Sequence, residues 1–261
     1  MMMGRPANAD RGIRRPSDPE MGLPNASAAT ASPGNPFSDK YIRIGFIRKV
    51  YAILSVQLLI TAAIIAAFIF VPGLNNFAKM NGLAMACAGI GSIVILLVLT
   101  CCGDLMRSFP TNFVLLFLFT ILNAISLSGA CVFYKRDEVM MAVGITAVIF
   151  VLLTMFAMQT AIDFTGCSAI SFVLIILLLI FGIVVAIFPS RTLQMVYSCV
   201  GAAVFCFYIV MDTQLIVGGA KRQCSLSPED YIAGALMLYL DAINLFLFIL
   251  QILNQFSGDE S

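Results

Sequence analysis

Long apolar runs alternate with short polar segments along most of this chain. Seven of the runs reach or approach the roughly 20 residues that a membrane-spanning helix needs. They cover residues 51–71, 83–101, 112–133, 139–159, 168–188, 193–217 and 232–253. Because the segments between them are short, neighbouring helices are expected to run antiparallel. The pattern predicts an all-α integral membrane protein, built as a bundle of seven transmembrane helices.

The first part of the chain differs from the rest. Residues 1–40 contain no apolar run and are rich in Pro, Gly, Ala, Ser and Arg, which predicts a disordered tail. Residues 41–256 form the expected transmembrane domain, and residues 257–261 a short C-terminal tail. No apolar segment follows Met1, so we expect no cleaved signal peptide and assign targeting to the first span.

Composition supports the membrane assignment and argues against several functions. The chain is 61% hydrophobic and 11% charged, against about 45–50% and about 25% in soluble domains. Its net charge of +1 gives no reason to expect nucleic-acid binding. Histidine is absent, so the commonest pH switch and transition-metal ligand is missing. Neither a phosphate-binding loop nor a dinucleotide motif is present, and we expect neither a cofactor nor enzymatic activity.

Lysine and arginine predict the orientation in the membrane. The segment before the first span holds eight of them: Arg5, Arg11, Arg14, Arg15, Lys40, Arg43, Arg48 and Lys49. Loops on the same side add Arg107, Lys221 and Arg222, and the opposite side holds Lys79, Lys135, Arg136 and Arg191. This asymmetry places the N-terminus in the cytosol and, with seven spans, the C-terminus outside or in a lumen. A re-entrant last helix would leave both ends cytosolic.

A basic stretch, KYIRIGFIRKV (residues 40–50), precedes the first span. Its lysines and arginines alternate with apolar and aromatic residues, a composition typical of the membrane interface. The sequence therefore predicts an interfacial lead-in, with Lys40, Arg43, Arg48 and Lys49 held at the lipid headgroups.

Two aspartates interrupt the last two apolar runs. Asp212 lies five residues before the end of one run, and Asp241 nine residues after the start of the next. They are thus about 8 Å and about 14 Å from the same membrane face. A carboxylate at the centre of a membrane helix costs roughly 2.5–3.5 kcal/mol, so it faces a partner or a water-filled cavity. A close pair of carboxylates is a hypothesis that this spacing permits.

Other polar residues share helix faces with one another or with the two acids. They are Gln57 with Thr61, Asn123 with Ser126, Gln159 with Asp163, Tyr208 with Asp212, and Asn244 and Gln251 with Asp241. Each can be an ordinary interhelical hydrogen bond of about 0.6 kcal/mol. Four of them, Asn244, Tyr208, Gln159 and Asp163, are also secondary candidates for lining a pore.

The two acids suggest a chemistry. Carboxylates held together at low dielectric share a proton and titrate in two coupled steps, which allows a pH response without histidine. Deprotonated, Asp212 and Asp241 offer hard oxygen ligands for transient binding of Ca²⁺. Arg107, at the cytosolic end of the second span, is a possible cationic latch. We hypothesise that protonation weakens such a latch and releases a closed pore.

Paired aspartates on neighbouring spans also occur in intramembrane aspartyl proteases, which is the enzyme alternative. Those proteins carry a YD motif and a GxGD motif followed by PAL. Here the acids lie in VMDTQ (210–214) and LYLDAI (238–243), and the sequence contains neither GxGD nor PAL. The protease interpretation is therefore disfavoured.

Five segments in order resemble the Bax-inhibitor family, and within it the lifeguard-like branch. They are FIRKVYAILSVQLLIT (46–61), CCGDLMRSFPTN (101–112), MQTAIDFT (158–165), DTQLIVGG (212–219) and SPEDYIAGALMLYLDAINLFLFIL (227–250). The resemblance covers about residues 41–256. It implies a seven-helix bundle with a central last helix wrapped by the other six.

The same resemblance implies a function. It implies a pH-sensitive calcium leak channel in the endoplasmic reticulum or Golgi that lowers store calcium and suppresses apoptosis. In the family a di-aspartyl unit is the pH sensor, and it carries over onto Asp212 and Asp241. The implied partners are the lipid bilayer, calcium as the permeant ion, and Bcl-2-family or other death-regulating membrane proteins. The alternatives are a non-conducting regulator that works through protein contacts, and a proton-coupled calcium exchanger.

Overall fold

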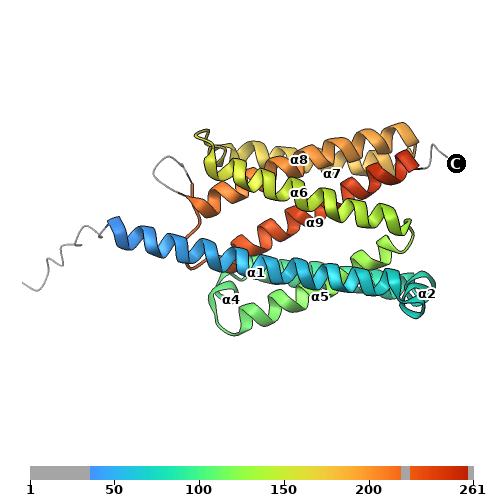
Figure 1. Ribbon diagram of the computed structural model, residues 1–261, viewed down its shortest axis with the longest axis horizontal. Coiled ribbons are helices and arrows are strands. Elements are labelled where there is room, and N and C mark those ends of the chain that lie inside the picture. The colour runs from blue at the N-terminus through green and yellow to red at the C-terminus, as the bar shows by residue number, and fades with distance from the viewer. Residues whose placement is uncertain (1–35, 219–223, 258–261) are drawn as a thin grey trace, which may run out of the picture.

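The computed structural model describes residues 36–218 and 224–257 of the 261-residue chain, and all regular structure in these ranges is helical (Figure 1). Seven helices are long and apolar enough to cross a membrane, which confirms the predicted fold class. They are α1 (Pro36–Phe70), α3 (Gly82–Cys101), α5 (Thr111–Cys131), α6 (Arg136–Gln159), α7 (Ser168–Ile187), α8 (Arg191–Val217) and α9 (Tyr231–Ser257). Three shorter elements connect them: α2 (Pro72–Met80), α4 (Gly103–Arg107) and the 3-10 turn η1 (Thr165–Cys167).

Helix α1 begins well before the apolar run from which it was predicted. It takes in the expected interfacial lead-in and residues 36–40, which the sequence assigned to the tail. The reason is a buried stripe at helical spacing: Phe46, Val50 and Leu54 are each at most 2% exposed. The lead-in is thus part of the helical bundle. Most of the expected tail, residues 1–35, lies outside the described residues.

Helix α9 runs through the middle of the bundle, as Figure 1 shows, with α1 and α5 on one side and α6, α7 and α8 on the other. It packs against α8, α1, α6 and α5. In its apolar stretch 56% of the residues are buried, against 17% in α3, α6 and α7. The central last helix is confirmed. Two helices lie further out, because α3 packs on α5 and α7 packs on α8.

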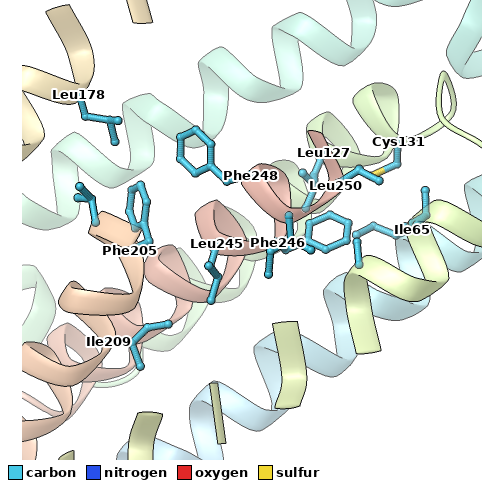
Figure 2. Close-up of a cluster of buried hydrophobic side chains, with 14 of the residues drawn as sticks. Ile65, Leu127, Cys131, Leu178, Phe205, Ile209, Leu245, Phe246, Phe248 and Leu250 are labelled. Carbon is cyan, nitrogen blue, oxygen red and sulfur yellow. The ribbon is translucent and has the colours of Figure 1, made fainter. Parts of the chain in front are cut away.

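Two apolar clusters hold α9 in place, one toward each end. The Phe46 cluster includes Phe46, Leu54, Phe119 and Ile232, and ends on α9 at Tyr239. The Phe248 cluster, shown in Figure 2, begins on α9 at Leu245 and gathers side chains such as Phe205, Phe246, Phe248 and Leu250. Residues 240–244 of α9 include Asp241 and Asn244, while Leu240 packs against the Phe46 cluster and Ile243 packs against both clusters. Asp241 and Asn244 are therefore polar positions where the two apolar clusters meet on α9.

A glycine allows α8 and α9 to approach closely. A methyl group built on Gly201 would collide with the ring of Phe248. Small residues have this role in membrane bundles, where lipid is as apolar as the helix surface and close packing supplies the attraction. The contact lies on the same pair of helices as the two aspartates, so it helps to set their separation.

Candidate functional site

The structure brings Asp212 of α8 and Asp241 of α9 together. Asp212 is 4% exposed and Asp241 is 6% exposed. Their carboxyl groups form a hydrogen bond with each other. Such a bond requires a proton on one of the two groups, because two ionised carboxylates offer acceptors only. Asp212 Oδ1 and Asp241 Oδ2 receive no hydrogen bond from an N–H or O–H donor in the described part of the chain. The hypothesis of a close carboxyl pair agrees with this geometry.

Tyr208 lies one turn before Asp212 on the same helix and interacts electrostatically with both carboxyl groups. Its hydroxyl donates a hydrogen bond to the backbone carbonyl of Ser171 on α7. The Ser171 hydroxyl in turn approaches the sulfur of Met211, at 2.8 Å. These contacts link α7 to the segment of α8 that carries Asp212, so Tyr208 borders the pair and anchors its helix.

Arg43 clamps the end of α8. Its guanidinium donates to three backbone carbonyls: Leu226 (2.7 Å), Val217 (3.0 Å) and Leu215 (3.2 Å). The last carbonyls of a helix have no partners within the helix, and a cation there also complements the helix dipole. The chain leaves the helix through Gly218, whose φ of 58° suits glycine and whose missing side chain leaves room for the guanidinium. Arg43 therefore fixes the turn that follows Asp212.

The sequence analysis put Arg43 at the lipid headgroups and did not foresee these protein partners. The signal was present, because Arg43 continues the stripe of Phe46, Val50 and Leu54 at a spacing of three residues. Because the segment was interpreted as lying at the membrane interface, the sequence analysis did not identify this stripe as a packing face. We call the end of the bundle at which Arg43 contacts Val217 and Leu226 the Arg43 end.

Gln214, two residues after Asp212, ties the loop between α6 and α7 to α8. Its Oε1 accepts from the backbone N–H of Phe164 at 2.8 Å, and its Nε2 donates to the carbonyl of Ile162 at 3.0 Å. The side chain is fully buried. Sequence analysis did not single it out, because nothing in the pattern shows which loop folds over which helix.

Arg107, the expected latch, has a different partner. Its guanidinium forms a bidentate ion pair with Asp230, in which Nε lies 2.9 Å from Oδ1 and Nη2 lies 3.2 Å from Oδ2. The Arg107 side chain is 55% exposed. Asp230 precedes α9 by one residue, eleven residues before Asp241 and about 16 Å away along a helix. The ion pair therefore joins α4 to the start of α9, and the latch assignment of Arg107 remains a hypothesis.

The other candidates lie at three separate places. Asn244 is one turn beyond Asp241 on α9, and its Nδ2 donates to the carbonyl of Leu240 at 2.8 Å. Gln159 is the exposed last residue of α6. Asp163 lies beyond that helix, where its Oδ1 accepts from the backbone and hydroxyl of Thr165 at 2.9 Å and 2.6 Å. The prediction that Gln159 and Asp163 share a helix face is wrong, because α6 ends at Gln159.

The pair has limited capacity for a metal ion. In the described ranges no group of three or more His, Cys, Asp or Glu side chains could hold a metal. Asp212 and Asp241 supply at most two carboxylates, whereas resident calcium takes six to eight oxygen ligands. The donor set fits brief contact with a passing hydrated ion better than a permanent site.

Comparison with known proteins identifies the family. Residues 43–258 match the family described as inhibitor of apoptosis-promoting Bax1. The chain is 40% identical to protein lifeguard 3 of Homo sapiens over 236 residues, covering 89% of this chain and 75% of that protein. The mouse (Mus musculus) protein of the same name is 38% identical, with coverages of 87% and 74%. The Golgi anti-apoptotic protein of Vaccinia virus (strain Lister) is 35% identical, with coverages of 82% and 86%.

The fold and the matches together define the class: a polytopic membrane protein whose described residues include seven spanning helices, the last of them central. The chain belongs to the Bax-inhibitor family, as the five sequence segments indicated. Membership places it among membrane proteins and not among enzymes, in agreement with the unmatched protease motifs.

Proposed function

We propose that this protein is a pH-sensitive calcium leak channel of an intracellular membrane, which lowers store calcium and thereby suppresses apoptosis. The observation that carries the proposal is the buried, hydrogen-bonded pair of Asp212 and Asp241 between the two apolar clusters. Buried acids are an expensive way to join two membrane helices, and they mark ion or proton pathways. The names of the matched family and of the viral relative support the link to cell death.

The pair itself can serve as the gate. With one shared proton, the bond between Asp212 and Asp241 is a charge-assisted O–H···O⁻ contact, which is about twice as strong as a neutral one. A second proton removes the charge and weakens the link between α8 and α9. Among the described residues, the ionisable side chain that interacts with both acids is Tyr208. The leak is therefore expected to increase as pH falls.

The test is calcium flux from liposomes that contain the purified protein, measured between about pH 6 and about pH 8, where a coupled buried pair can respond. Wild type should show a flux that rises toward acid pH. The double variant Asp212→Asn, Asp241→Asn keeps side-chain size and hydrogen bonding but cannot ionise, so its flux should lose most of its pH dependence. A variant that retains the full pH response would remove the pair from the mechanism.

Two controls separate the rival functions. Flux that is absent from folded wild type, with a normal melting transition in detergent, would favour a non-conducting regulator acting through protein contacts. Calcium movement that stops when the proton gradient is collapsed would favour a proton-coupled exchanger over a leak. The Golgi or endoplasmic reticulum is the proposed location, and the viral relative's name favours the Golgi.

A further inference from the structure

Two adjacent cysteines, Cys101 and Cys102, lie where α3 leaves the apolar part of the bundle. Cys101 is the last residue of α3, and the backbone N–H of Cys102 donates to the Val98 carbonyl at 3.0 Å. Both residues are exposed, and both thiols are free. The span that α3 provides ends at Cys101, and a short connecting helix, α4, follows. The two thiols therefore lie at the edge of a membrane span, where the chain passes from hydrocarbon to headgroups.

Cys101 continues a stripe of apolar side chains on the outer face of α3. Ile90, Val94 and Leu97 are each more than half exposed, and together with Cys101 they follow one another at spacings of four, three and four residues. Such spacing puts the four side chains on one face of the helix. Leu99, on the other side of α3, is fully buried in the Phe46 cluster. The stripe therefore faces lipid when α3 crosses the membrane.

The length of the stripe and the space around its end suit a covalently attached acyl chain. From Ile90 to Cys101 the helix rises about 16 Å, which is close to half of the roughly 30 Å hydrocarbon core. A long chain on the Cys101 sulfur can thus lie along the stripe from the headgroups to the middle of the bilayer. The approach is open, because a methyl group added at Gly103 would meet no atom within 4 Å and Phe109 is exposed.

The two cysteines lie at the Arg43 end of the bundle. They directly precede α4, whose Arg107 forms the ion pair with Asp230 just before α9. The loop before α9 also contains Leu226, one of the carbonyl partners of Arg43. In the predicted orientation this end faces the cytosol. Cysteines beside a membrane span are typical sites of reversible S-acylation, and the cytosol contains the long-chain acyl-coenzyme A that the reaction needs.

The other cysteines whose side chains the structure describes lack this combination of features. Cys131 and Cys206 are not exposed. Cys87 is exposed but lies near the start of α3, at the opposite end, and Cys199 lies nine residues into α8, within its span. Cys224 is exposed at the Arg43 end, but in a loop, seven residues from both α8 and α9. Among these residues, only the adjacent pair is exposed at the end of a span beside a lipid-facing stripe.

We propose that Cys101, with Cys102 beside it, is a site of reversible S-acylation by a long-chain fatty acyl group. The cysteine thiolate is the nucleophile and attacks the thioester carbonyl of a long-chain acyl-coenzyme A bound to an acyltransferase. The new C–S bond forms as the bond to coenzyme A breaks, and coenzyme A leaves as a thiol with the proton that the cysteine gave up. The attached chain anchors the junction of α3 and α4, and α4 contacts the start of the central helix α9.

Thiol exchange on the full-length protein from cultured animal cells tests this site. Free thiols are blocked with a maleimide, hydroxylamine cleaves thioesters, and a polyethylene glycol maleimide adds mass to each thiol that is released. Wild type should show heavier species that appear only with hydroxylamine. Cys101→Ser should lose most of this signal, because the thiol at the end of the stripe is gone, and Cys101→Ser, Cys102→Ser should lose all of it. Cys224→Ser, which removes the exposed loop cysteine at the same end, is the matched control and should keep the wild-type signal.

Mass spectrometry of the wild-type peptide that contains Cys101 and Cys102 decides the proposal even if the double variant fails to fold. A long-chain acyl group on this peptide supports the site. Wild type without hydroxylamine-dependent signal, or a folded double variant with the full signal, would overturn it. Thiols that a reductant releases and hydroxylamine does not would indicate a disulfide and would also overturn it. None of these readouts uses calcium flux, so the result is independent of the proposed channel function.

Discussion

At the scale of single residues, the structure separates two arginines that are alike in sequence. Arg107 forms an exposed ion pair with Asp230, and such pairs contribute about 0–1 kcal/mol. Arg43 donates to the carbonyls of Leu215 and Val217 in the last turn of α8 and to that of Leu226 in the loop that follows. Hydrogen bonds from charged donors contribute about 1.5–3 kcal/mol, so Arg43 has the larger effect.

Arg43→Gln should therefore lower the stability of the folded protein by about 1.5–3 kcal/mol, seen as a lower melting temperature in detergent. Because it loosens the turn after Asp212, it should also shift the pH midpoint of calcium flux. Arg48→Gln, at an exposed position on the same helix, is the matched control and should change neither. Arg107→Gln should leave the pH midpoint in place. A shifted midpoint in Arg107→Gln with a normal one in Arg43→Gln would reverse the two assignments.

At the scale of helices, packing between α8 and α9 depends on one missing side chain. The ring of Phe248 occupies the space that a side chain at Gly201 would need. By contrast, a methyl group added at Gly144 on α6 would meet no atom within 4 Å. Glycine has the same low helix propensity at both positions, so a difference in stability between the two alanine variants reports on the surrounding side chains.

Gly201→Ala should destabilise the protein by about 1–3 kcal/mol, because overpacking forces Phe248 and the backbone to shift. Gly144→Ala should be neutral or raise stability by up to about 1 kcal/mol, since alanine favours the helix. Thermal unfolding of both variants in the same detergent gives the comparison. Equal melting temperatures would show that α8 and α9 tolerate a wider separation than the structure has. Altered pH dependence of flux in Gly201→Ala would further link this contact to the carboxyl pair.

At the scale of the whole molecule, the continuous length of α9 bears on which of two topologies the chain adopts. Its 27 residues span about 40 Å, enough to cross the roughly 30 Å hydrocarbon core. The re-entrant alternative has no support from this helix. Together with the excess of Lys and Arg before the first span, this favours a cytosolic N-terminus and a C-terminus on the opposite side.

Protease protection in sealed microsomes measures this topology. A tag placed before Met1 should be digested by added protease, whereas a tag placed after Ser261 should be protected until detergent opens the membrane. The charge asymmetry and the odd number of spans give opposite locations for the two ends. Digestion of both tags in intact vesicles would restore the re-entrant arrangement.

The sequence by itself determined the membrane class, the seven spans and the two acids, because apolar run length and a charge inside a run are local properties of the chain. It also indicated the family, through segments that need no contacts to be recognised. Only the tertiary structure decided the rest. That Asp212 meets Asp241 and that Arg43 caps α8 both depend on helix rotation and on pairs distant in sequence. Hydropathy fixes which segments enter the membrane, whereas side-chain packing fixes which faces meet.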